Sequence, residues 1–138
     1  MIVTITLNAA LDRTLVAPGF TLGQSRTVDR ALSLGGGKGL NVARALHGLS
    51  CAVLALGLAG GETGAAIRRV LAEEGIPSDL TQIREESRTC TAIIDPLSGL
   101  STEINEPGPR VAEDELAPFL DRFQRVLSDA SLIALSGS

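Results

Sequence analysis

The sequence predicts an α/β fold in which helices cover a parallel sheet and shorter strands form a separate small sheet. Residues 51–58 form an almost continuous apolar run, which is typical of a strand covered on both faces in a parallel sheet. Helical patterns alternate with such strands, as in strand–helix–strand units. Several other strands are short and alternate between apolar and polar residues, which favours a second sheet with an exposed face.

Local patterns place the strands in chain order. Residues 1–8 alternate like a strand, and Pro18 and Gly23 mark a turn between the next two strands. The expected strands lie at 1–8, 13–17, 25–34, 51–58, 79–84, 88–95, 101–105 and 131–135. The candidates for the small sheet are the four at 13–17, 25–34, 88–95 and 101–105.

Three helices are expected from apolar residues at helical spacing. The first follows a glycine-rich segment, the second spans about 62–74, and the third lies near 113–128 with an acidic first turn that suits the helix dipole. Pro118 falls in the second turn of the third helix, so this helix begins either at 113 or at Pro118 itself. The residues expected to face the core are Val42, Ala43, Leu46 and Leu49 in the first helix and Ile67, Val70 and Leu71 in the second.

Composition bounds the class of protein. The chain has 138 residues, 44% of them hydrophobic, which suits one domain with its own core. The net charge of −4 and the presence of only three aromatic residues argue against a nucleic-acid binder. No apolar run is long enough to span a bilayer, and the two cysteines lack metal-ligand spacing. We therefore expect a cytoplasmic protein with free thiols and no metal, membrane or nucleic-acid partner.

The most informative segment runs from Gly35 to Asn41 and reads GGGKGLN. Glycine has no Cβ, so the backbone can approach a ligand closely here. The helix that follows directs its unpaired N–H groups and the positive end of its dipole at this segment, and Lys38 adds a full charge. The glycine spacing fits neither a P-loop nor the GxGxxG motif of a dinucleotide-binding domain. An anionic or polyhydroxylated ligand is the expected occupant.

Two further polar residues, Asn8 and Asp12, follow the first strand. Ligand sites in open α/β sheets form beyond the carboxyl ends of the strands, so Asp12 is a candidate ligand contact as well as a turn residue. The sequence finishes with an apolar strand at 131–135 and then Ser-Gly-Ser. Because a ligand loop and a helix are expected to follow such a strand, we expect this chain to be the first part of a longer one.

Several motifs follow one another along the chain: LNAALD at 7–12, GGGKGLNVARAL at 35–46, AGGETG at 59–64, Ser87-Arg88, TEINEPGP at 102–109 and the final SGS. In this order they resemble the phosphofructokinase B family of sugar-phosphate kinases, which have the ribokinase-like fold. The resemblance spans essentially the whole chain but only the front portion of the family's pattern. It departs from that pattern at Ala9, where proline is common, and at Cys90, where asparagine is common.

The resemblance implies a role for particular residues. Asp12 would accept hydrogen bonds from sugar hydroxyls, and Arg88 would hold the phosphate already on the substrate, with Arg26 as a weaker second candidate. Ser138 would lie near the same pocket. The residues that would line the sugar pocket are Gly36, Gly37, Lys38 and Asn41.

The resemblance also implies a reaction, the transfer of a phosphoryl group from ATP, with Mg²⁺, to a ketohexose phosphate of the fructose 1-phosphate or fructose 6-phosphate type. The family's catalytic aspartate and ATP pocket belong to its later part, which 1–138 does not match. This chain would therefore carry the acceptor site without a catalytic residue, and we expect it to be inactive alone. The small sheet would serve as a lid and as the interface of a homodimer of the full-length protein.

Two other functions stay open. A ribokinase-like kinase would act on an unphosphorylated sugar or a nucleoside, in which case Arg88 would not hold a phosphate. A non-catalytic module would bind a sugar phosphate without turning it over.

Overall fold

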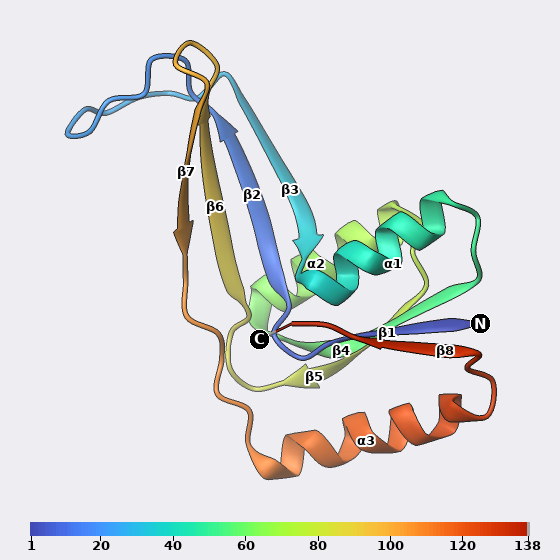
Figure 1. The fold of residues 1–138 in the computed structure, drawn as a ribbon. Helices are drawn as coiled ribbons and strands as arrows, with labels where there is room; N and C mark the ends of the chain where they lie inside the picture. The colour runs from blue at the N-terminus through green and yellow to red at the C-terminus, as the bar shows by residue number, and fades with distance from the viewer. Residues whose placement is uncertain (138) are drawn as a thin grey trace.

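A computed structural model describes residues 1–137 and shows an α/β fold with two sheets (Figure 1). Three helices accompany eight strands in this part of the chain. In chain order the elements are β1 (Ile2–Thr6), β2 (Ala10–Val16), β3 (Arg30–Gly36), α1 (Lys38–Gly48), β4 (Val53–Gly60), α2 (Gly61–Glu73), β5 (Ser78–Ile83), β6 (Arg88–Asp95), β7 (Leu100–Asn105), α3 (Glu113–Leu127) and β8 (Leu132–Leu135).

The first sheet is parallel and has the strand order β5-β4-β1-β8. Helices α1 and α2 cover one face and α3 covers the other, as Figure 1 shows. The predicted buried strand at 51–58 is confirmed as β4. The last six residues of this strand are all buried. A strand with helices on both faces has no side that tolerates polar residues, which explains its continuous apolar run.

The side chains of the parallel sheet supply two cores. Leu40 of α1 and Ile67 and Leu71 of α2 pack on one face, and each is fully buried. Val3 and Ile5 of β1 point to the other face, where Phe119 of α3 packs on them. The alternate residues of β1, Thr4 and Thr6, are buried toward α1. These layers hold the carboxyl end of β1 rigidly under α1.

The second sheet is mixed and confirms the predicted separate sheet. Its order is β3-β2-β6-β7, in which β2 pairs parallel with β6 while the two outer strands are antiparallel to their neighbours. Figure 1 shows this sheet standing away from the parallel sheet. Two strands of this sheet differ from their predicted bounds by more than one residue. β2 begins at Ala10 rather than 13, and β3 begins at Arg30 rather than 25 and continues through Gly36.

The inward face of α1 also differs from the prediction. Leu40 and Ala43 are buried, Val42 and Leu46 are partly buried, and Leu49 is 74% exposed. The helical spacing fits two overlapping faces, and the choice between them depends on how α1 docks on β1. In α2, the predicted Ile67 and Leu71 are buried as expected, whereas Val70, also predicted to face inward, is only partly buried.

Helix α3 begins at Glu113 and contains Pro118, so the later of the two predicted starts is wrong. Glu115 sets the start because its carboxylate accepts a hydrogen bond from the backbone N–H of Ala112, at 2.9 Å, just before the first turn. Pro118 is the sixth residue of α3, so it removes one intrahelical hydrogen bond, and the helix nevertheless continues to Leu127. No helix among residues 1–137 has the length and apolar character needed to cross a membrane.

Candidate functional site

The site begins where the first turn of α1 meets the carboxyl end of β1. Gly37, the residue before α1, has φ 112°, a backbone conformation that residues with a side chain rarely adopt. Gly39 packs directly on β1. A Cβ at this position would overlap the carbonyl oxygen of Ile5 and the hydroxyl of Thr6. Glycine at 39 therefore lets the helix N-terminus lie against the strand.

The mixed sheet brings Asp12 to the same place. Asp12 lies inside β2 rather than in a turn after the first strand, and its carboxyl lies over Gly36 of the paired strand β3. A Cβ on Gly36 would overlap that carboxyl. The predicted glycine loop is therefore shorter than expected. Gly35 and Gly36 end a strand, Lys38 begins α1, and only Gly37 lies between them.

Arg88 is the first residue of β6 and is placed by its neighbour Ser87. Ser87 is buried and closes two hydrogen bonds with Gly60 at the end of β4, each of 3.0 Å. Because β6 pairs with β2, Arg88 lies opposite Ala10, two residues from the Asp12–Cys90 pair. Within residues 1–137 the buried Arg88 Nε has no hydrogen-bond partner.

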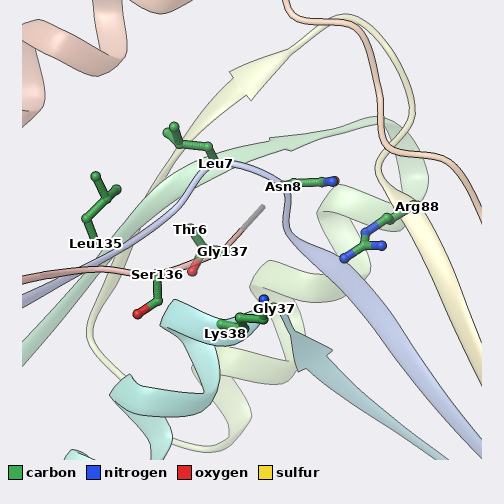
Figure 2. A pocket seen from close by; sticks show the side chains of 9 residues that line it. All are labelled: Thr6, Leu7, Asn8, Gly37, Lys38, Arg88, Leu135, Ser136 and Gly137. Atoms are coloured by element: carbon green, nitrogen blue, oxygen red, sulfur yellow. The ribbon is translucent and has the colours of Figure 1, made fainter.

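These elements enclose two neighbouring cavities. The sheet cavity lies against the mixed sheet and has a volume of about 370 Å³, and the strand-end cavity has a volume of about 220 Å³ (Figure 2). Gly37, Lys38 and Arg88 line both. The sheet cavity is further lined by Asp12, Arg13, Thr14, Asn41, Cys90, Thr91, Ala92, Glu103 and Asn105. The strand-end cavity is further lined by Thr6, Leu7, Asn8, Leu135, Ser136 and Gly137.

Five of the residues predicted for the site line the sheet cavity: Asp12, Gly37, Lys38, Asn41 and Arg88. The structure thus brings together residues from β2, α1 and β6, although their binding role stays a prediction. Gly36 lies beneath Asp12 instead of lining the cavity. Ser138 lies outside the described residues.

Arg26, the second phosphate candidate, is not among the residues that line either cavity. It lies between β2 and β3, where its guanidinium donates a hydrogen bond to the carbonyl of Gly19. The structure therefore argues against a role for Arg26 in the site of this chain.

Sequence reasoning missed the wall that β7 contributes. Glu103 and Asn105 line the sheet cavity because β7 pairs with β6, where Asn105 lies opposite Cys90. The alternation of β7 is visible in the sequence. The face that points to the cavity is fixed only by the pairing of β2 with β6, about 78 residues apart in the chain.

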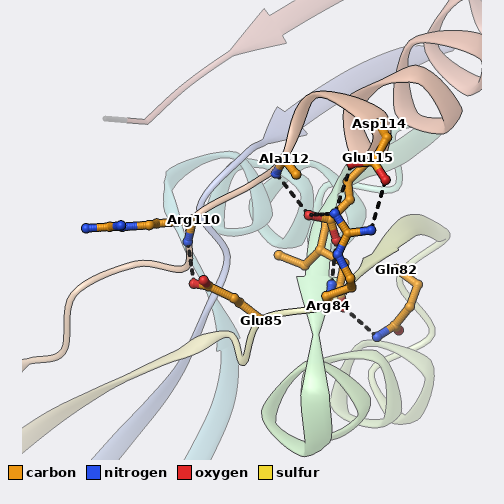
Figure 3. Close-up of polar contacts among 8 residues, drawn as sticks. Gln82, Arg84, Glu85, Arg110, Ala112, Asp114 and Glu115 are labelled. Atoms are coloured by element: carbon orange, nitrogen blue, oxygen red, sulfur yellow. Dashed lines mark hydrogen bonds and ion pairs between the residues drawn. The ribbon is translucent and has the colours of Figure 1, made fainter.

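A linker from β7 to α3 closes the site near Asn8. A Cβ on Gly108 would overlap the Asn8 amide, so glycine leaves room for this side chain, whose buried Oδ1 has no partner within 1–137. The linker is tied to the segment after β5. The Glu85 carboxylate accepts a hydrogen bond from the backbone N–H of Arg110 at 2.7 Å (Figure 3).

The start of α3 is tied to the same segment (Figure 3). The Arg84 guanidinium pairs with both carboxylate oxygens of Asp114, each at 2.9 Å. Glu115 accepts the backbone N–H of Arg84 at 2.6 Å, in addition to that of Ala112. These two backbone donors lower the pKa of Glu115, and Arg84 lowers it further. The charged side chains of Arg84, Asp114 and Glu115 lie outside the cavity linings and hold the start of α3.

The sheet cavity contains charges of both signs. Burial raises the pKa of Asp12 above its usual value, while the charges of Arg88 and Arg44 pull it partly back. Burial also raises the pKa of the Cys90 thiol, which keeps it protonated near neutral pH. Arg88, Lys38 and the N-terminus of α1 offer donors to an anion, and Asp12 offers an acceptor to hydroxyl groups. This arrangement suits a ligand that combines an anionic group with hydroxyls.

No group of three or more His, Cys, Asp or Glu side chains in the described part of the chain is arranged to hold a metal ion.

The sequence was compared with families of known proteins. The pattern of the pfkB family carbohydrate kinases matches residues 5–138. The chain is also similar to solved structures. A possible 1-phosphofructokinase from Thermotoga maritima has a TM-score of 0.92 and 32% sequence identity, and the match covers 100% of this chain and 45% of that one.

Two structures of phosphofructokinase-2 from Escherichia coli are also similar to this chain. One is in complex with fructose-6-phosphate and has a TM-score of 0.89 and 26% identity, over 99% of this chain and 45% of that one. The other is the tetrameric inhibited form, with a TM-score of 0.88 and 28% identity, over 99% and 44% of the two chains. The chain thus spans less than half the length of these structures.

The contact between α1 and β1 yields a prediction with an internal control. Gly39→Ala is expected to destabilise the chain by about 1–3 kcal/mol, because its Cβ would overlap backbone and Thr6 atoms that cannot move away easily. Gly48→Ala, at the other end of α1, meets no atom within 4 Å and is expected to be neutral or to stabilise by up to about 1 kcal/mol. Urea unfolding measures both. Equal effects of the two variants would contradict the close contact.

Proposed function

The chain belongs to the pfkB family of carbohydrate kinases, and from this premise we propose that its sheet cavity binds a ketohexose phosphate, the acceptor in phosphoryl transfer from ATP. The observation that carries the proposal is the convergence of Asp12, Lys38 and Arg88 on one cavity. These residues come from three elements far apart in the sequence. Together they supply the acceptor and the donors that a phosphorylated sugar requires.

Each part of such a ligand has a matching group. A phosphate dianion suits Arg88, whose planar guanidinium can bind two oxygens at once, with Lys38 and the α1 N-terminus adding positive charge. Sugar hydroxyls suit Asp12, whose carboxylate accepts hydrogen bonds. Fructose 1-phosphate and fructose 6-phosphate both carry this combination. The E. coli structure that contains fructose-6-phosphate lends support to the latter class of ligand.

The proposal divides the reaction between two parts of the family's domain. Residues 1–138 supply acceptor recognition, and we assign the sites for ATP and Mg²⁺, together with the catalytic base, to the part that this chain does not span. ATP supplies the phosphoryl group that is transferred. This chain binds and orients the sugar, which lowers the entropic part of the activation barrier for phosphoryl transfer. In this proposal it takes no part in the proton or phosphoryl transfer itself. We therefore expect no turnover from the chain alone.

We also propose that the mixed sheet closes over the sugar and pairs with a second copy of the chain. Leu32, Leu34 and Ile94 are all exposed and share the face that carries Asp12. A row of exposed apolar side chains on one face of a sheet favours contact with another protein surface. The tetrameric form of E. coli phosphofructokinase-2 shows that a similar chain assembles with itself.

Binding of phosphosugars tests the proposed function directly. At about 100 times Kd, fructose 1-phosphate or fructose 6-phosphate is expected to stabilise the chain by about 2.7 kcal/mol, measured by thermal unfolding. Arg88→Ala is expected to weaken binding roughly 10- to 100-fold, because a charge-assisted hydrogen bond is lost. Arg69→Ala removes the same charge from an exposed position on α2 and is expected to change nothing.

Unphosphorylated fructose distinguishes the alternatives. Binding of fructose as tightly as its phosphates, with no effect of Arg88→Ala, would favour a kinase of unphosphorylated sugars. Failure of the unmodified chain to bind any ketose phosphate would refute the proposal.

The loss of phosphosugar affinity at low pH is expected to depend on the protonation of Asp12. A protonated carboxyl loses its charge and turns one acceptor oxygen into a donor, so it holds sugar hydroxyls less strongly than the carboxylate does. Affinity should therefore fall as the pH drops through the raised pKa of Asp12, above the usual value of about 3.9. Titration calorimetry between pH 4 and 8 measures this. Asp12→Asn should bind more weakly at neutral pH and lack this loss, keeping only the change due to phosphate ionisation near pH 6. Parallel profiles for the two proteins would rule out an acceptor role for Asp12.

The proposed pairing makes its own prediction. Leu32→Glu places a charge in the apolar face and is expected to convert a dimer into a monomer, as measured by analytical ultracentrifugation. Ile104→Glu is the matched control, because Ile104 is also exposed but lies on the opposite face of the mixed sheet. A monomeric unmodified chain, or equal effects of the two variants, would contradict pairing through this face.

A further inference from the structure

Arg44, on α1, contacts Asn41, which lines the sheet cavity, together with residues of two other elements. Its Nη1 donates a hydrogen bond to Asn41 Oδ1 at 2.9 Å, and its Nη2 donates one to the carbonyl of Gly35 at 2.6 Å. The same guanidinium pairs with both carboxylate oxygens of Glu74, each at 2.9 Å. One side chain therefore joins α1, the end of β3 and the end of α2.

The chemistry of the guanidinium fixes the orientation of the Asn41 amide. Arginine donates hydrogen bonds and accepts none, so the Asn41 atom that faces it must be the oxygen. The amide nitrogen of Asn41 is then free to face away from Arg44. Asn41 is exposed and lines the sheet cavity. Its two N–H groups are thus available to a ligand, whereas its oxygen is already engaged.

We propose that Arg44 is a positioning residue that presents Asn41 to the cavity as a hydrogen-bond donor, so that Asn41 recognises an acceptor oxygen of the sugar phosphate. This inference rests on the proposed function. It adds that Asn41 donates, rather than accepts, the hydrogen bond that it forms with the ligand. With Lys38 and Arg88, Asn41 then belongs to the donors, and Asp12 faces them as an acceptor. The ligand oxygen that meets Asn41 must therefore bring a lone pair.

Glu74 makes this orientation stable. The Arg44 and Glu74 side chains are only about a quarter exposed, at 26% and 25%, and their two parallel hydrogen bonds fix the plane of the guanidinium. The same guanidinium donates a hydrogen bond to the carbonyl of Gly35, whose neighbour Gly36 lies under the Asp12 carboxyl. The charge of Arg44 also lowers the pKa of Asp12. Arg44 thus acts on both Asn41 and Asp12 without lining the cavity itself.

Asn41→Asp separates this role from a purely structural tie between the helices. The carboxylate keeps an oxygen for Arg44, so the melting temperature should be unchanged or higher. It removes the donor and adds a negative charge toward the ligand. Calorimetry with fructose 1-phosphate and fructose 6-phosphate should give at least a tenfold weaker affinity, and Asn41→Ala should fall between this variant and the unmodified chain. Equal or tighter binding by Asn41→Asp would overturn the inference.

A double-mutant cycle tests the contact without any ligand. The melting temperatures of Asn41→Ala, Arg44→Met and the double variant should be non-additive, because each single change removes the same hydrogen bond. Arg44→Lys keeps the positive charge but lacks the planar guanidinium. Its affinity for the sugar phosphates should therefore match that of Arg44→Met. Additive melting temperatures would overturn the inference. A non-additive cycle without any phosphosugar binding would keep the Arg44–Asn41 contact and refute the proposed function instead.

Discussion

The site depends on one close contact, between the first turn of α1 and the last residues of β1. β1 is an inner strand of the parallel sheet, between β4 and β8, so its carboxyl end lies in the middle of the sheet edge. Gly39 lets the helix rest on that end without an intervening side chain. Lys38 precedes this glycine and Asn41 follows it within one turn. Their positions therefore follow from the contact, and a helix held even slightly further away would carry both out of the cavity.

The other half of the site comes from the mixed sheet, and specific ties hold it in register with the first half. Helix α2 packs on both sheets, since its Ile67 and Leu71 lie in the core of the parallel sheet and against Gly35 of β3. Polar ties then set the fine position. Ser87 fixes the start of β6 on the end of β4, and Arg44 fixes the end of β3 on α1. Apolar packing joins the sheets, and directional hydrogen bonds align them.

Local sequence patterns sufficed where neighbouring residues decide the structure. The apolar run of β4 and the bounds of β6 at Arg88 and Asp95 were recognisable because burial and turn residues mark them. Local patterns failed where a distant partner decides. Gly35 and Gly36 look like a loop, but pairing with β2 extends the strand through them. Glu103 could not be placed in the cavity, since its facing depends on a chain of pairings from β2 through β6 to β7.

The same pairings explain why the cavity keeps its charges of opposite sign apart. Arg88 lies opposite Ala10, whereas Asp12 lies two residues further along β2, an offset of about 6.5 Å. The charge of Arg88 lowers the pKa of Asp12, yet Asp12 and Arg88 form no ion pair in the described structure. A direct pair would satisfy both groups and leave little for a ligand to gain. By holding them apart, the register of β2 on β6 leaves an acceptor and a cation each in need of a partner, and a molecule with hydroxyls at one end and an anion at the other satisfies both at once.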